Sequence, residues 1–509
     1  MTLLSVASLL VVWASLLSAD EPKPRYGGTL RLADQYQGIS IGYPPKLGNM
    51  SSMRYAGPAV ETLLRTDKTG MLVPWLATGF KEDAKKKTVT LTLRKGVKFH
   101  DGTDFNAEAV KWNLDQSKSA RTIGTGKLDS VDVVDDYTVR INLSDWDSTF
   151  SGSLSHYIGM MISPAAYKKN GEEWCAGHPT GTGPFQLVSW VTDVRATYKK
   201  FDDYWQKGKP YLDRIEYNII TDSLTRQLSL RRGEVDLVMW SDAKDIAGLE
   251  KDGFVVTRRK MGAGVYSMIP DSANPASPFA NPKVRQATQY AIDTEAIIKT
   301  IYYGQAEYTN QWIYKGHWGY NPSVVGYPYN PEKAKQLMAE AGYQKGFETK
   351  ILYRTNPQDD QFFTAVQGYL KAVGIEAQLD PATPARYNQI AYGGKWEGLV
   401  QDAPTTATSD VAAPLAQMYC GGGKYYTQML VPADYEKAIQ DAITAPSFNA
   451  KQKSVQEAMK LMIDKYCLQI ILSSQLLATT VSQAHVHNVG IYETSAAGTW
   501  APESAWLDR

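Results

Sequence analysis

The chain has 509 residues, of which 43% are hydrophobic and 21% are charged, as is typical of a soluble globular protein of two or three domains. Its 54 lysines and arginines balance 53 aspartates and glutamates, which argues against nucleic acid or an acidic membrane as a partner. The 31 tyrosines and 13 tryptophans are numerous enough to line a pocket for a ligand with polar and apolar parts.

The first segment in chain order, residues 1–19, is predicted to be a signal peptide that is removed on export. Its apolar run from Leu3 to Leu17 is shorter than a membrane span of about 20 residues, and Leu17-Ser18-Ala19 suits a signal peptidase. No lysine or arginine precedes the run, and a membrane anchor or a core segment is the alternative interpretation. No cysteine lies near the cleavage site, so a lipoprotein anchor is not indicated.

Strands and one capped helix are predicted between residues 26 and 143. Residues 26–32 begin a first strand, and the aromatic loop 34–49 is either a plain surface loop or part of a ligand site. Alternating apolar and polar side chains predict a strand at 88–93 and a hairpin at 131–143. Asn106 is expected to cap the helix that follows it.

Residues 178–238 predict a strand-helix-strand core. A glycine- and proline-containing turn releases into alternating strands at 185–190 and 194–199. A third strand is expected at 211–220, then a helix at 224–230 and a short apolar strand at 235–238. No segment of this core carries a catalytic pattern.

The second half of the chain predicts another α/β unit. Asparagine followed by proline, the residues that favour helix starts, occurs at 281–282 and at 330–331. Residues 350–353, 359–373 and 375–379 predict strand, helix and strand, a βαβ unit that implies a parallel sheet.

An ordered set of strings, taken together, resembles the family 5 extracytoplasmic solute-binding proteins of ABC transporters, the dipeptide-, oligopeptide- and nickel-binding group. One such string alone is a weak signal, but the set extends over nearly the whole chain. The strings are RKGVKFHDG (94–102), GTGPFQLVSW (181–190), KPYLDRIEYNII (209–220), RRGEVDLV (231–238), VRQATQYAID (284–293) and YNPEKAKQLMAEAGY (329–343). The resemblance implies a periplasmic, monomeric protein that captures a peptide or small-molecule ligand and docks on ABC permease subunits.

The resemblance also implies an α/β, two-lobed periplasmic-binding-protein fold of class II or cluster C type, with an extra domain in the first lobe and two hinge crossovers. The first lobe is expected to combine residues 26–60, 176–266 and 480–509. Residues 61–175 are expected to form the additional domain, and residues 267–479 the second lobe. Two lobes that are joined by two strands can close on a ligand by hinge bending.

Enzyme signatures are absent: the sequence has no P-loop, no GxSxG, no HExxH and no cysteine/histidine cluster. We therefore expect no enzyme, cofactor or metal. The alternative function is a secreted hydrolase that acts on peptides or glycosides through paired carboxylates, although no pattern selects such a pair. His100 beside Asp101 is interpreted as a turn residue, and His485 with His487 as strand-edge residues rather than a metal pair.

Three cysteines, Cys175, Cys420 and Cys467, allow at most one intramolecular disulfide, and the sequence leaves open which pair forms.

Ten residues are candidates for the ligand site, by their type and by their position in the family that the chain resembles. Asp402 and Asp410 lie in a segment similar to the relatives' acidic loop, where an aspartate can receive the ligand's ammonium group. The aromatic candidates can instead be core residues. The ten are Tyr36, Met239, Trp240, Tyr266, Trp312, Arg354, Trp396, Asp402, Asp410 and Tyr419.

One departure from the family bears on the ligand. Dipeptide receptors carry an arginine near the start of the helix predicted at 359–373, where it binds the peptide carboxylate. Here Asp359, Asp360 and Gln361 stand in that place. Because burying a carboxylate without an ionic partner costs several kcal/mol, we expect an oligopeptide or another small organic solute ahead of a free dipeptide or nickel. A dipeptide remains the alternative if Arg354 points into the cleft.

Overall fold

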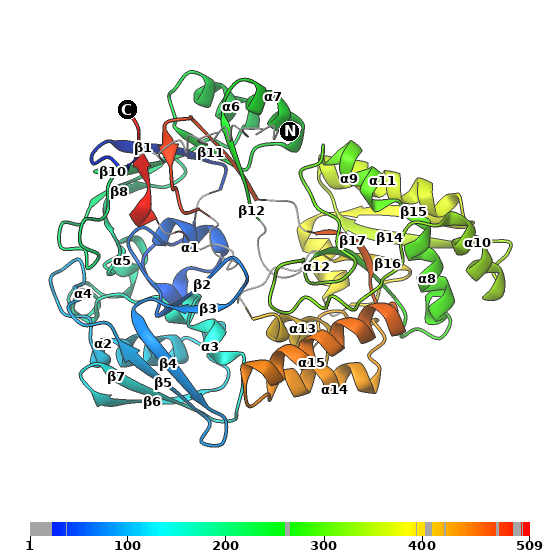
Figure 1. Cartoon of the computed structure of the whole chain (residues 1–509), viewed down its shortest axis with the longest axis horizontal. Coiled ribbons are helices and arrows are strands. Elements are labelled where there is room, and N and C mark those ends of the chain that lie inside the picture. Colours follow the sequence, from blue (N-terminus) through cyan, green and yellow to red (C-terminus); the bar gives the residue numbers. More distant parts are fainter. Residues whose placement is uncertain are drawn as a thin grey trace, which may run out of the picture.

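The protein is seen here as a computed structural model that describes residues 23–36, 38–259, 265–392, 394–402, 410–421, 424–474, 478–491, 500 and 502–509. The predicted signal peptide lies outside these residues. Two α/β lobes stand side by side, with the first lobe and its additional domain on the left of Figure 1 and the second lobe on the right. None of the helices in the described part of the chain has the length and apolar character of a membrane span.

The first lobe is built on a sheet to which seven described strands contribute. Their spatial order is β12 (Val255–Arg259), β18 (Ala478–Ser482), β11 (Leu237–Met239), β1 (Thr29–Asp34), β10 (Arg214–Ile219), β9 (Arg195–Lys200) and β8 (Phe185–Val191). β1 runs parallel to both β10 and β11, and the outer strands are antiparallel to their neighbours. The helices of this lobe are α1 (Met50–Ala56), α6 (Ser223–Arg231) and α7 (Ala243–Lys251).

The additional domain has its own four-stranded sheet and its own apolar core. The strand order is β4 (Ala77–Asp83), β5 (Thr88–Leu93), β7 (Thr138–Leu143) and β6 (Leu128–Asp135), and β2 (Leu64–Thr66) pairs separately with β3 (Leu72–Pro74). The helices are α2 (Ala107–Ser119), α3 (Phe150–Ser153), α4 (Pro164–Asn170) and α5 (Glu172–Gly177). The predicted cap is confirmed, because Asn106 Oδ1 accepts a hydrogen bond from Ala109 N at 3.0 Å.

The second lobe is built on a five-stranded sheet. The strand order is β15 (Ile375–Ala382), β14 (Phe347–Arg354), β16 (Leu399–Asp402), β13 (Val265–Pro270) and β17 (Ile470–Ser474). β14 and β15 are parallel and flank α11 (Pro357–Lys371), so the predicted βαβ unit is confirmed. α11 begins two residues earlier than predicted because Asn356 caps it and Pro357 occupies its first position. The other helices are α8 (Pro282–Ala291), α9 (Thr294–Ile301), α10 (Pro331–Glu340), α12 (Pro384–Ala391), α13 (Ala412–Tyr419), α14 (Ala433–Ile443) and α15 (Phe448–Lys460).

The chain crosses between the lobes twice. β12 of the first-lobe sheet is followed by β13 of the second-lobe sheet, and β17 of the second-lobe sheet is followed by β18 of the first. Within the described residues, no cluster of buried apolar side chains contains members from both lobes. The lobes therefore have separate cores, and a change in their relative orientation breaks neither core.

A buried carboxylate joins the additional domain to the first lobe. Glu61 Oε1 accepts hydrogen bonds from the indole nitrogen of Trp75 and the hydroxyl of Tyr204, each at 2.8 Å. Glu61 Oε2 accepts from Thr182 Oγ1 at 2.8 Å and from the indole nitrogen of Trp205 at 3.0 Å. Burial raises the pKa of Glu61, while Arg65 and these donors oppose the rise. Each carboxylate oxygen thus faces one indole, a group that can only donate.

The additional domain also contacts the second lobe at two places. In the first, the carbonyl of Thr69 accepts from the backbone nitrogen of Trp318 at 3.0 Å, and a Cβ atom on Gly70 would lie 2.2 Å from His317 Nε2. In the second, the indole nitrogen of Trp146 donates to the carbonyl of Ala445 at 2.8 Å, just beyond α14. The additional domain therefore bridges the two lobes.

The C-terminal segment packs on the first lobe. β19 (Val486–His487) pairs antiparallel with β20 (Trp506–Leu507), and Val486 and Leu507 belong to the first lobe's core. The His487 ring stacks on Trp506 with centroids 4.1 Å apart. No group of three or more histidine, cysteine or acidic side chains suited to a metal ion occurs among the described residues, so the metal interpretation of this histidine pair gains no support.

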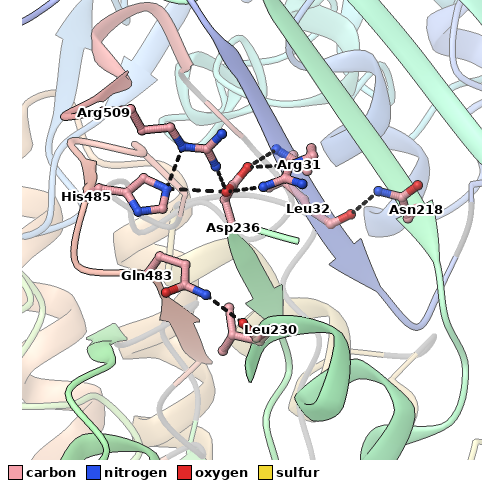
Figure 2. Close-up of polar contacts among 8 residues, drawn as sticks. All are labelled: Arg31, Leu32, Asn218, Leu230, Asp236, Gln483, His485 and Arg509. Carbon is pink, nitrogen blue, oxygen red and sulfur yellow. Dashed lines mark hydrogen bonds and ion pairs between the residues drawn. The ribbon is translucent and has the colours of Figure 1, made fainter. Parts of the chain in front are cut away.

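A buried aspartate fastens this C-terminal segment (Figure 2). Asp236, directly before β11, accepts from Arg31 Nε at 3.0 Å and Nη2 at 2.9 Å, and Arg509 and His485 also contact its Oδ1. Burial raises the pKa of Asp236, but the hydrogen bonds and charges of Arg31 and Arg509 outweigh it, so the pKa lies below its ordinary value. Three segments that are distant in the sequence thus meet at one carboxylate.

Candidate ligand-binding site

The end of the second-lobe sheet brings several predicted site residues together. β14 ends at Arg354 and β16 ends at Asp402, and because these strands are parallel, both residues lie at the same edge. β13 runs antiparallel to β16 and places Ser267 opposite Asp402, with Tyr266 beside it. Carboxyl ends of parallel strands are where α/β sheets commonly bind ligands.

Asp402 is the centre of a buried hydrogen-bonded group. Its Oδ1 accepts from the hydroxyl of Tyr426 at 2.9 Å, and its Oδ2 accepts from the hydroxyl of Tyr419. The indole nitrogen of Trp312 donates to the same Tyr419 hydroxyl at 2.9 Å. Burial raises the pKa of Asp402 to about 6, against the lowering effect of the hydroxyls around it. Asp402, Tyr419 and Trp312 have no exposed surface in this structure, so they support the sheet edge from inside.

Gln401 links the other residues of this edge and was not predicted from the sequence. Its side-chain nitrogen donates to the hydroxyl of Tyr266 and, at 3.1 Å, to Asp359 Oδ2, while its Oε1 accepts from the backbone nitrogen of Arg354 at 2.7 Å. Burial raises the pKa of both Asp359 and Tyr266. A glutamine at the end of a strand gives no sequence signal for this role, since its partners come from three other elements.

Arg354 faces a cavity of about 1120 Å³ between the second lobe and the additional domain. Its Nη2 donates to Asn388 Oδ1 at 3.2 Å and to the hydroxyl of Tyr392 at 2.9 Å, and its guanidinium lies 4.4 Å from the ring centroid of Tyr387. None of the described carboxylates lies within 4.0 Å of this guanidinium. The arginine is therefore held by neutral groups, and none of the described acids forms an ion pair with it.

The remaining walls of the cavity were not predicted either. On the second lobe it is lined by Gln417, Met418 and Tyr425, and on the additional domain by the segment 118–128 and by residues 147–153 near α3. Segment 118–128 contains Lys118, Arg121 and Lys127, but nothing in its sequence indicates that it faces the second lobe.

The first-lobe candidates divide into edge residues and a core residue. β1 and β11 are parallel neighbours, so Tyr36 and Trp240, which follow their carboxyl ends, lie at one edge of the sheet. The side chain of Tyr36 is 57% exposed, and the Arg54 guanidinium lies 5.6 Å from the Trp240 ring. Arg54 is itself buried against Asp34, with Nη2 and Oδ2 3.1 Å apart. Met239 is fully buried in the first-lobe core, where its contribution is packing.

Two candidates lie away from both edges. Trp396 is nearly buried and lines a separate depression of about 600 Å³ with Lys350 and Leu352. Asp410 forms an ion pair with Lys451, with Oδ2 and Nζ 2.7 Å apart, and both side chains are nearly buried. Residues 403–409, which complete the predicted acidic loop, lie outside the described part of the chain.

The sequence features that suggested possible enzyme or disulfide chemistry have structural roles. His100 is partly buried, its Nε2 lies 2.9 Å from the carbonyl of Gly183, and desolvation lowers its pKa to about 4. Asp101 accepts instead from Thr103, 2.6 Å from the threonine hydroxyl. The three cysteines are buried and free, so none of them forms a disulfide in this structure.

Comparison with known proteins identifies the family. The sequence profile described as bacterial extracellular solute-binding proteins, family 5, middle region, matches residues 71–426. This chain belongs to that family. The resemblance and the two-lobed fold predicted from the sequence are therefore confirmed for this solute-binding protein.

Individual relatives of this family 5 protein differ in name. It is 33% identical over 353 residues to heme-binding protein A of Haemophilus influenzae, covering 63% of this chain and 64% of that protein. It is 35% identical over 328 residues to glutathione-binding protein GsiB of Salmonella choleraesuis, covering 63% of each. Both matches span just under two thirds of the relative's length. The structure of HbpA2 from Haemophilus parasuis has the same fold, with a TM-score of 0.82, 23% identity and coverage of 95% of this chain and 100% of that one.

Proposed function

We propose that this protein is the extracytoplasmic solute-binding component of an ABC importer. It captures a peptide or another small organic solute between its lobes and delivers it to the membrane permease without chemical turnover. The observation that carries the proposal is the pair of lobes with separate cores, joined by two strand crossings. Such a construction permits hinge closure around a solute, and membership of family 5 supports the same class of activity.

We propose the predicted ranges as the mechanical units. Residues 26–60, 176–266 and 480–509 form the first lobe, residues 61–175 move with it as the additional domain, and residues 267–479 form the second lobe. The boundaries at 266/267 and 479/480 fall inside the crossing strands β13 and β18. The protein is exported as a monomer after removal of residues 1–19. Closure then brings Tyr36 and Trp240 toward Arg354, so that the solute contacts both lobes.

Arg354 is the polar anchor that we propose for the solute on the second lobe. Tyr266, Asp402, Tyr419 and Trp312 act behind it as positioning residues, because they lie in or against the same hydrogen-bonded sheet edge. Relatives are named for heme and for glutathione, so the family by itself does not select the ligand. We do not propose a hydrolase, because Asp402 is fully buried and Asp359 nearly so, each held by hydrogen bonds within the lobe.

Three measurements on one preparation test this function. Native mass spectrometry of the protein purified from its host should detect one solute per chain. Small-angle scattering should show a smaller radius of gyration with that solute than without it. Incubation with peptides and glycosides should give stoichiometric capture and no accumulating product. Sustained product formation, or a bound solute that leaves the radius unchanged, would overturn the proposal.

A further inference from the structure

We propose that the cavity between the additional domain and the second lobe is a two-sided anion site, where Arg354 holds a carboxylate of the solute and Lys118, Arg121 and Lys127 attract its further negative charge. This inference rests on the proposed function and names its solute class. The solute is a small organic anion with at least two negative groups. It spans the two walls and so ties the additional domain to the second lobe.

The side chains that line the cavity have an excess of positive charge. Four cationic side chains, one on the second lobe and three on the additional domain, face it together with one carboxylate, that of Asp147. The cavity therefore has a formal surplus of three positive charges, whereas the whole chain has a net charge of +1. The Asp147 carboxylate is occupied by Thr149, whose backbone nitrogen and hydroxyl donate to it at 2.8 and 2.7 Å, and burial raises its pKa.

The Arg354 guanidinium uses only part of its hydrogen-bonding capacity. Among the described residues its Nη1 and Nε have no hydrogen-bond partner, and the Nε atom is buried. Arg285, a buried arginine of the same lobe, shows what a structural guanidinium looks like in this protein. Its Nε, Nη1 and Nη2 all donate to backbone carbonyls, for example Nη1 to Phe279 at 2.7 Å and Nη2 to Tyr466 at 2.6 Å. Arg354 instead keeps Nη1 without a partner, and a carboxylate of the solute can accept a charge-assisted hydrogen bond from this nitrogen.

The wall that the additional domain contributes to the cavity is cationic. Arg121 and Lys127 are exposed, and no described carboxylate lies within 4.0 Å of either. Lys118 Nζ is 4.0 Å from Asp129 Oδ1, at the limit of an ion pair. Lys118 Nζ also donates to the carbonyl of Asp129. Together the three cations raise the local concentration of an anion in a confined space. Pockets for small ligands measure about 300–1,000 Å³, so a cavity of about 1120 Å³ has room for a solute that reaches both walls.

Glutathione, which has two carboxylates, and its diethyl ester, in which both are masked, are the matched probes. Isothermal titration of the mature protein should show that glutathione or citrate binds and that the ester does not, and binding should weaken as NaCl rises from about 50 to 300 mM. Arg354→Gln and the combined Lys118→Gln, Arg121→Gln, Lys127→Gln variant should each weaken anion binding about tenfold or more. The control is a Lys169→Gln, Arg232→Gln variant of exposed cations that do not line the cavity, which should stay within about twofold of the parent.

Each other outcome contradicts a stated part of the proposal. Equal binding of the ester, no anion binding at millimolar concentration, or cavity variants that behave like the control would overturn the anion site. Inorganic phosphate that binds more tightly than the carboxylates would overturn the carboxylate assignment. A neutral solute bound one per chain and insensitive to Arg354→Gln would overturn this inference while leaving the importer function standing. Circular dichroism of each variant distinguishes lost binding from lost folding.

Discussion

The buried carboxyl of Asp402 gives a prediction whose sign depends on pH. In the folded protein, burial raises the pKa of Asp402 to about 6, compared with 3.8 for an ordinary aspartate. The folded state thus holds the proton more tightly than the unfolded state does. The stability from this group is fully present below about pH 3.8 and is lost as the pH rises to about 6. A difference of this size between the two states is equivalent to about 3 kcal/mol.

Asp402→Asn removes this pH dependence while keeping the shape of the side chain. The hydroxyls around Asp402 can both donate and accept, so an amide can be accommodated. Tyr426, for example, can accept from the new amide and turn its own proton toward the hydroxyl of Tyr387, 3.4 Å away. The stability of the variant relative to the parent should therefore rise by about 3 kcal/mol from about pH 4 to pH 7.5. The variant should be the less stable protein in acid and at least as stable as the parent at neutral pH.

Urea denaturation followed by tryptophan fluorescence, at a series of pH values, measures this difference. Asp434→Asn is a control of opposite sign, because the hydrogen bond from Lys465 lowers the pKa of Asp434. The parent should lose its advantage over that control as the pH falls, since an acid with a lowered pKa stabilises the folded state only above its unfolded value. If the difference between parent and Asp402→Asn changes by less than about 1 kcal/mol across the range, the hydroxyls keep Asp402 ionised and the reasoning is refuted.

Three further predictions concern contacts between domains or between distant segments of one lobe. Glu61→Gln should lower the free energy of unfolding by about 2–4 kcal/mol, because either orientation of the amide sets its NH₂ group against an indole donor; a change below about 0.5 kcal/mol in thermal denaturation would contradict this. Asp236→Asn should speed hydrogen exchange in the C-terminal strands β19 and β20. Its loss of stability relative to the parent should shrink as the pH falls below about 4, since the pKa of Asp236 is lowered in the folded protein. An unchanged exchange rate would show that Asp236 does not hold the C-terminal segment in place. Gly70→Ala, at φ +83 and against His317, should lower the melting temperature more than Gly102→Ala, which has the same φ and nothing within 4 Å of the new Cβ; equal effects would show that the contact is dispensable.

The sequence by itself determined the local elements and the family. Asn281 and Asn330, each followed by proline, cap α8 and α10 as predicted, because a cap needs only groups within one helical turn. The βαβ unit around α11 likewise follows from the period of its apolar residues. The family could also be recognised from the sequence, since its motifs consist of turn and helix-cap residues that follow one another in a fixed order. Local periodicity was therefore sufficient for the α/β class.

Only the tertiary structure decided which residues lie together at the proposed site. Arg354 and segment 118–128 share a cavity although more than 200 positions separate them, and no local pattern encodes that encounter. Asp402 was predicted as a residue that meets the ligand, and it lies fully buried among hydroxyls, because the register of β13 and β16 sets it opposite Ser267. Gln401 gained its role in the same way, from partners on β13, β14 and α11. Burial and pairing of polar groups depend on how sheets and lobes pack, a property of the folded chain as a whole rather than of any segment.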